Sequence, residues 1–381
     1  MQLKYSLVAL ACIATLSAED SISISYLQYD EDNNRVSVSA PAIAIQKDFG
    51  KDYTLDVYVV SDSVSGATPT YVEENVVASS GATSVATTTS VVPVYNQSNE
   101  FDEVRNAYTL NLTKRLENRN EISIGTTVSL ESDYYSYELS GGYLQYLDTA
   151  KNRSLNYGLS AQFNEILVYC ASSTDTEVCD ASSGSSEAAT SIGIGTEIGL
   201  SQILDKNSII KGSLFLKYED GYLSNPYLKA VKDDGVSLTL ESDQRPDTRL
   251  GYGAYLSYKN AFRDNQTFQV DYRLYSDDWG ILSNTVNTKY YYEATNDLTL
   301  GFGLRYYKQS EADFYQEGYF EPSARYLSSD ERLSDFSAVT YTFEAKYNIT
   351  DKLSTNFSYN SYDQSTDLSA TYYTLGFKYK F

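Results

Sequence analysis

The stretch TFQVDYRLYSDDWGILSNTVNTKYYYEA, Thr267 to Ala294, alternates apolar and polar residues on both sides of an acidic corner. Successive side chains of a β-strand point to opposite faces, so a period of two predicts one apolar and one polar face. In the first run the apolar face is formed by Phe268, Val270, Tyr272 and Leu274. The stretch therefore predicts two strands of about ten residues, joined by a tight corner at SDDWGI.

The same alternation recurs along the chain, for example from Arg249 to Tyr258 and from Leu298 to Tyr307. Gly, Ser, Asn and Thr are frequent on its polar face, as in the wet interior of a membrane barrel. Tyrosine supplies 38 of the 381 residues, and amphipathic aromatic rings gather where an apolar band meets water. Composition alone also permits a secreted β-sandwich or β-solenoid, but the alternation favours a transmembrane antiparallel β-barrel.

The connections between the alternating runs are of two kinds, short and mostly long, and the two kinds alternate along the chain. The short connections are KDFGKD from Lys47, LENRN from Leu116, DTAKN from Asp148, LDKN from Leu204, KNAFRDN from Lys259, TND from Thr295 and NITDK from Asn348. The long ones are Ser63 to Glu103, Tyr169 to Ala188, Glu219 to Asp247 and Ser310 to Asp335. Short periplasmic turns and long extracellular loops are typical of outer-membrane barrels.

Counting from Ser21–Tyr29 to the final run Thr371–Phe381 predicts a barrel of about sixteen strands. The count can differ by two, because Val36–Ile45 and Tyr137–Tyr146 alternate poorly. The final run places aromatic and apolar residues on one face up to the terminal Phe381. It resembles the C-terminal strand signal that bacterial barrel-assembly machinery recognises, so this machinery and outer-membrane lipid are expected partners.

The N-terminus has the arrangement of a secretory signal peptide. Lys4 precedes the apolar run YSLVALACIATL, and the small residues Ser17 and Ala18 follow it. We expect residues 1–18 to be a cleaved signal peptide and residues 19–381 to form a barrel in the bacterial outer membrane. No later stretch approaches the roughly 18 consecutive apolar residues of a spanning helix, so a membrane protein with this sequence would have to cross the bilayer as a barrel of strands.

Two cysteines, Cys170 and Cys179, lie beyond the signal segment in a loop rich in Ser, Thr and Asp. An even pair in an exported chain predicts a disulfide-closed loop rather than a redox site. A zinc site would lack its usual imidazole partner, because the chain has no histidine. We therefore expect no metal site.

The absence of histidine also excludes imidazole as a catalytic base or nucleophile. Asp277 and Asp278 are the most obvious carboxylate pair, but neighbours in a tight corner point in different directions rather than across a substrate. The net charge of −22 disfavours nucleic acid as a partner and suits an exposed surface or one bridged by divalent ions. We expect no enzymatic activity and no cofactor.

Four basic residues share the polar face of four consecutive predicted strands: Arg249, Arg273, Lys289 and Arg305. Their expected acidic partners, on or above the same lumen wall, are Asp271, Glu293, Asp277 and Asp278. The charges can form a salt-bridge lattice that stiffens the wall, or one side of a pore constriction that orients a polar solute. Trp279, at the outer corner, is expected either to anchor the barrel at the interface or to pack against a loop.

Several motifs at the edges of the predicted loops resemble those of an uncharacterised family of bacterial outer-membrane barrels, the domain of unknown function DUF3570. They are SGATP from Ser65, DGYLSNPY from Asp220, RPDTR from Arg245, YRLYSDDWGI from Tyr272 and RYYKQSEADFY from Arg305. Their order and spacing cover nearly the whole mature chain, and the resemblance implies the barrel fold.

We expect a porin-like channel that passes a small polar or ionic solute and is narrowed by an inward-folded loop. The alternative is a plugged structural or export-associated barrel whose acidic outer loops bind a partner.

Overall fold

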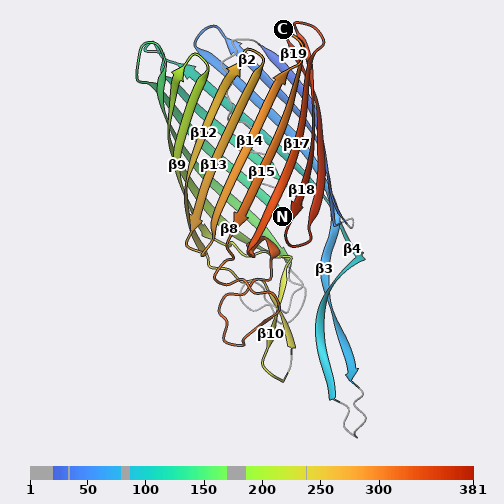
Figure 1. Ribbon diagram of the computed structural model, residues 1–381. Coiled ribbons are helices and arrows are strands. Elements are labelled where there is room, and N and C mark those ends of the chain that lie inside the picture. The colour runs from blue at the N-terminus through green and yellow to red at the C-terminus, as the bar shows by residue number, and fades with distance from the viewer. Residues whose placement is uncertain (1–19, 33–34, 79–85, 170–185, 237) are drawn as a thin grey trace.

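A computed structural model describes residues 20–32, 35–78, 86–169, 186–236 and 238–381. Sixteen strands close into an antiparallel barrel in which sequence neighbours pair and β1 pairs with β19 (Figure 1). They are β1 (Ser21–Glu31), β2 (Val36–Phe49), β3 (Tyr53–Ala78), β4 (Ala86–Arg115), β5 (Glu121–Leu130), β6 (Tyr134–Tyr146), β7 (Arg153–Tyr169), β8 (Ser186–Asp205), β9 (Ser208–Gly221), β12 (Thr248–Arg263), β13 (Gln266–Asp277), β14 (Leu282–Glu293), β15 (Leu298–Gln309), β17 (Phe336–Asn348), β18 (Leu353–Gln364) and β19 (Ser369–Lys380). The predicted strand number and fold class are confirmed, including the poorly alternating β2 and β6.

The outer surface of the barrel is apolar and the inner surface mainly polar. Large apolar side chains stand exposed at every second position of the strands, and Leu159 and Leu214 are 61% and 62% exposed. Such a continuous band would be unfavourable in water but matches the lipid-facing band of an outer-membrane barrel. The other set of alternate side chains on each strand therefore faces the lumen.

The connections sort to the two ends of the barrel as predicted, and the C-terminus lies at the end with the short turns (Figure 1). The first long connection differs from the expectation. Between Ser63 and Glu103 the chain continues as β3 and β4, which stay paired as far as Ala78 and Ala86. This two-stranded ribbon projects beyond the barrel (Figure 1), because strand pairing continues past the last neighbouring strand.

Two other long connections build a small second sheet at the same end. Its strands are β10 (Lys229–Asp233), β11 (Leu238–Ser242) and β16 (Tyr319–Phe320), in the order β11-β10-β16. Ala230, Phe320 and Leu327 form its buried core. The second of these connections also contains the short 3-10 helix η4 (Glu331–Leu333).

A buried ion cluster joins the two connections. Arg245 donates to Asp243 from Nε at 2.7 Å and to Asp330 from Nη2 at 2.8 Å. Burial alone would lower the pKa of Arg245, but the two carboxylates outweigh it and hold that pKa above its ordinary value. The guanidinium therefore stays charged and ties the loop after β9 to the loop after β15.

The expected signal peptide and the pair Cys170 and Cys179 lie outside the described residues. None of the helices in the described part of the chain is long and apolar enough to cross a membrane.

Candidate functional site: the charged lumen wall

The four basic residues lie on the inward parity of adjacent strands β12 to β15. Their sequence neighbours Leu250, Tyr272 and Leu304 are exposed on the outer face. The alternation thus places the basic side chains on one continuous part of the lumen wall. Their environments nevertheless differ: among the described residues, two of the four cations form ion pairs and two do not.

Arg249 is fixed at the extracellular rim. Its Nε and Nη2 donate to Asp277 Oδ2 at 2.9 and 2.5 Å, and its guanidinium lies 4.4 Å from the ring centroid of Trp279. The Asp277 carboxylate is fully buried and also accepts the Tyr275 hydroxyl at 2.9 Å. Asp277 is therefore a partner of the basic wall, as the sequence predicts.

The corner after β13 also anchors an extracellular loop. Asp277 Oδ1 accepts the backbone N–H groups of Trp279 and Ile281 at 3.1 and 3.0 Å. Trp279 is only 3% exposed and packs with Ile281, Ala312 and Leu333, while its Nε1 donates to the Thr248 carbonyl at 2.8 Å. The indole thus packs against the loop that contains Ala312. The neighbouring Asp278 remains exposed and accepts the Leu250 N–H at 2.9 Å.

Lys289 pairs with a residue that the sequence did not single out. Its Nζ lies 2.9 Å from Oε1 of Glu344 on β17, across the intervening strand β15. A Cβ added to Gly301 of β15 would lie 3.1 Å from the Glu344 Cβ, so the missing side chain gives the ion pair its space. Two features of the sequence could have indicated this pair. Glu344 lies on the polar face of its strand, and glycines occupy alternate positions of β15.

The two acids expected beside the ladder have other surroundings. Asp271 is buried and accepts amide hydrogens from Gln269 Nε2 at 3.0 Å and Asn287 Nδ2 at 3.1 Å. Glu293 ends β14 at the short-turn side of the barrel and is exposed. Neither forms an ion pair among the residues that the structure describes, so the expected pairing of the ladder with these two acids is wrong.

Arg273 and Arg305 remain without a carboxylate partner within 4.0 Å in the described part of the chain. Both are exposed. The Arg273 guanidinium lies 4.9 Å from the ring centroid of Phe215, and that of Arg305 lies 5.8 Å from the ring centroid of Tyr307. The middle of this wall therefore presents two open positive charges among aromatic rings.

The wall half-way round the barrel has a different character. Ala42, Val60 and Ala107 pair directly across β2, β3 and β4 and form a buried apolar row. Arg105 of β4 forms a buried ion pair with Asp62 of β3. Both residues flank the segment Ser63 to Glu103 that the sequence suggested as an outer loop, and the sequence did not single out this pair.

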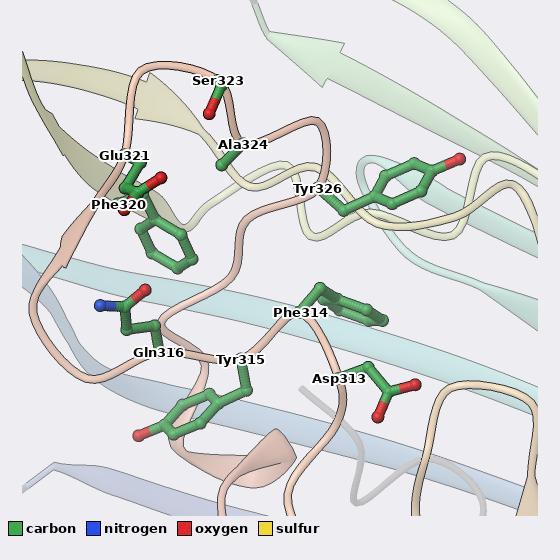
Figure 2. Close-up of a pocket in the computed structure, with 9 residues that line it drawn as sticks. All are labelled: Asp313, Phe314, Tyr315, Gln316, Phe320, Glu321, Ser323, Ala324 and Tyr326. Atoms are coloured by element: carbon green, nitrogen blue, oxygen red, sulfur yellow. The ribbon is translucent and has the colours of Figure 1, made fainter.

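A separate small pocket of about 260 Å³ lies in the loop after β15. Figure 2 shows its aromatic lining, to which Phe314, Phe320 and Tyr326 contribute, together with the carboxylates of Asp313 and Glu321. The pocket belongs to the extracellular loops rather than to the lumen, so the charged lumen wall is the candidate site for solute passage.

The closed barrel, apolar outside and polar inside, defines an outer-membrane β-barrel protein. The chain belongs to the family described as protein of unknown function (DUF3570), whose model matches residues 6–376. No curated protein shows significant sequence similarity to it.

Solved structures share the fold at low sequence identity. CdiB from Acinetobacter baumannii has a TM-score of 0.53 at 8% identity, and the match covers 95% of this chain but 60% of CdiB. OccK5 (OpdH) from Pseudomonas aeruginosa has a TM-score of 0.44 at 8% identity, covering 95% of this chain and 98% of OccK5. The CymD monoaromatic hydrocarbon channel has a TM-score of 0.44 at 10% identity, covering 95% and 88%. These likenesses concern the fold alone.

Proposed function

We propose that the protein is an outer-membrane channel for small polar or ionic solutes and that its lumen prefers anions. The observation that carries this proposal is the pair of exposed guanidinium groups, Arg273 and Arg305, on the inner face of the barrel. Arg249 and Lys289 are held in ion pairs and serve the stiffness of the same wall. The two roles considered for the basic residues are thus divided among them.

Local charge outweighs net charge in setting ion preference. The charges of the acidic extracellular surface act on an ion through water, and salt screens their electrostatic potential over about 8 Å at physiological ionic strength. Side chains that line a lumen act on a permeating ion at close range and in a lower effective dielectric constant. A chain with a net charge of −22 can therefore contain an anion-preferring passage.

The test is the reversal potential of single channels in planar bilayers under a salt gradient. Arg273→Ser combined with Arg305→Ser should lower the anion-to-cation permeability ratio about two- to fivefold. The matched control removes two exposed positive charges from short turns, Lys206→Ser with Lys352→Ser, and should leave the ratio unchanged.

Repeated absence of open steps in wild-type protein would overturn the channel and favour the plugged, partner-binding barrel. Open channels whose selectivity is equal in wild type and in the double arginine variant would overturn the anion preference alone.

A further inference from the structure

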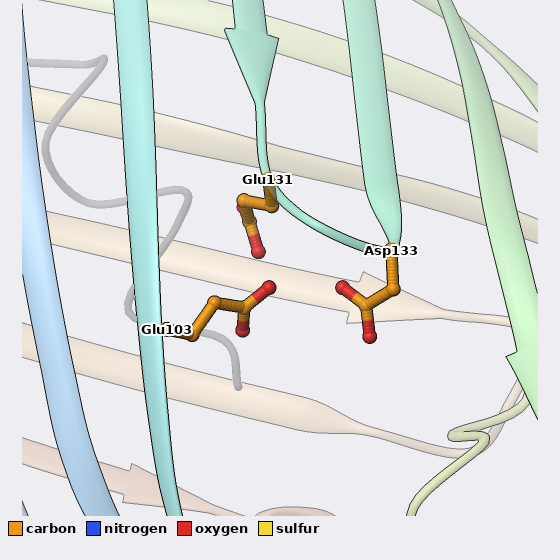
Figure 3. A group of neighbouring side chains, drawn as sticks. All are labelled: Glu103, Glu131 and Asp133. Atoms are coloured by element: carbon orange, nitrogen blue, oxygen red, sulfur yellow. The ribbon is translucent and has the colours of Figure 1, made fainter.

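Three carboxylates converge at the extracellular mouth of the barrel, on β4 and at the adjoining ends of β5 and β6. They belong to Glu103 of β4 and to Glu131 and Asp133 of the corner between β5 and β6. One oxygen from each lies within 4.8 Å of the others. Figure 3 shows the three side chains directed toward a common space.

Burial makes this arrangement unfavourable without a counter-charge. Glu131 and Asp133 are each 6% exposed, and the Oδ1 atom of Asp133 is buried without a hydrogen-bond partner. A buried carboxylate oxygen that no donor reaches is costly, and neighbouring negative charges add repulsion. Arg105, two residues along β4 from Glu103, is bound to Asp62.

The backbone holds the corner in place. The N–H of Leu167 on β7 donates to the Asp133 carbonyl at 2.7 Å, and the Glu131 N–H donates to the Tyr134 carbonyl at 3.0 Å. Ser132 Oγ donates to Glu103 Oε1 at 3.3 Å. Asp133 thus reaches into the group from a corner that is tied to the barrel on both sides.

We propose that Glu103, Glu131 and Asp133 bind a calcium ion. Calcium prefers carboxylate oxygens at about 2.3 to 2.6 Å, so two oxygens on one ion lie at most roughly 5.2 Å apart. The three carboxylates meet this condition, because one oxygen from each lies within 4.8 Å of the others. Its coordination tolerates irregular geometry and completion by water, whereas magnesium demands near-octahedral ligands. The site departs from the expectation, drawn from the sequence, that the protein has no metal site.

The ion would join β4 to the β5–β6 corner at the level where the β3–β4 ribbon leaves the barrel (Figure 1). Pairing of β4 with β5 ends at Asn106 and Leu130, so the backbone ladder does not hold Glu103 to the corner. Calcium would add to the hydrogen bond from Ser132 to Glu103 as a link between β4 and the corner, and would fix the base of the ribbon.

The test is isothermal titration of the full-length detergent-solubilised protein with CaCl₂ after removal of divalent ions. Wild type should show one saturable site with a dissociation constant of about 10⁻³ M or tighter. Glu131→Gln with Asp133→Asn should weaken it about tenfold or more. Asp133→Asn alone, an isosteric change, should weaken it in the same direction and keeps the test valid if the double variant folds poorly.

The control replaces two exposed acids of another extracellular loop, Glu311→Gln with Glu317→Gln, and should retain the site. Hydrogen exchange in the corner at residues 130–134 should slow on addition of calcium in wild type only. Absence of saturable binding by wild type, or equal loss in the control pair, would overturn the site. Stronger binding of Mg²⁺ than of Ca²⁺ would overturn the choice of ion.

Discussion

The replacement Asp277→Asn isolates the ion pair that fixes the outer corner of the charged wall. Asparagine has the shape of aspartate and can still accept the N–H groups of Trp279 and Ile281 through its carbonyl oxygen. The position of Oδ2, which accepts two hydrogen bonds from Arg249 and one from Tyr275, would hold an NH₂ donor or a neutral oxygen. The change therefore leaves Arg249 in its place without its hydrogen-bonded counter-charge.

Removing one partner of a buried ion pair costs about 3 to 5 kcal/mol. The Arg249 side chain is 16% exposed, so water can solvate part of the guanidinium, and we expect the lower end, about 3 kcal/mol. The matched control is Asp278→Asn, the same change at the next residue. Asp278 is exposed and can accept the Leu250 N–H as an amide, so its effect should stay within about 0.5 kcal/mol.

Trp279 is the only tryptophan of the chain, which makes indole fluorescence a local probe of this corner. Guanidinium chloride unfolding in lipid vesicles, followed by indole emission and by far-ultraviolet circular dichroism, separates opening of the corner from loss of the sheet. Asp277→Asn should shift the fluorescence transition to lower denaturant, whereas Asp278→Asn should not. Equal fluorescence midpoints for wild type and both variants would refute the assignment of Asp277 as the anchor of the corner.

Two further predictions concern the wall and the exposed loop. Gly301→Ala should destabilise the barrel by about 1 kcal/mol in the same unfolding assay, because the added Cβ would lie 3.0 Å from Tyr291 Cε1 and 3.1 Å from Glu344 Cβ. The control Gly158→Ala should have little effect, because its added Cβ would lie 3.8 Å from the nearest atom. The disulfide expected between Cys170 and Cys179, outside the described residues, should stabilise by roughly 2 to 3 kcal/mol, and mass spectrometry of unreduced protein that finds both thiols free would contradict it.

The fold could be predicted from the sequence because its signals are local. Alternation such as that from Phe268 to Leu274 assigns each side chain to the lumen or to lipid without knowledge of its neighbours. The turn and loop lengths then give the direction of the barrel, since each connection is read from its own residues. The same parity placed Arg249, Arg273, Lys289 and Arg305 on one wall.

The partners of those residues could not be read in this way, because they depend on register and on contacts across more than one strand. Lys289 meets Glu344 across the glycine-bearing strand β15, and no local pattern specifies that diagonal contact. The second sheet pairs β10 with β16 in parallel, where Val231 meets Tyr319. Arg245 likewise contacts Asp330, which lies 85 residues further along the chain. Glu103 joins Glu131 and Asp133 only because β4 extends past its pairing with β5. The face on which a side chain lies is a property of one strand. A site needs several strands, and only the closed barrel brings them into fixed register.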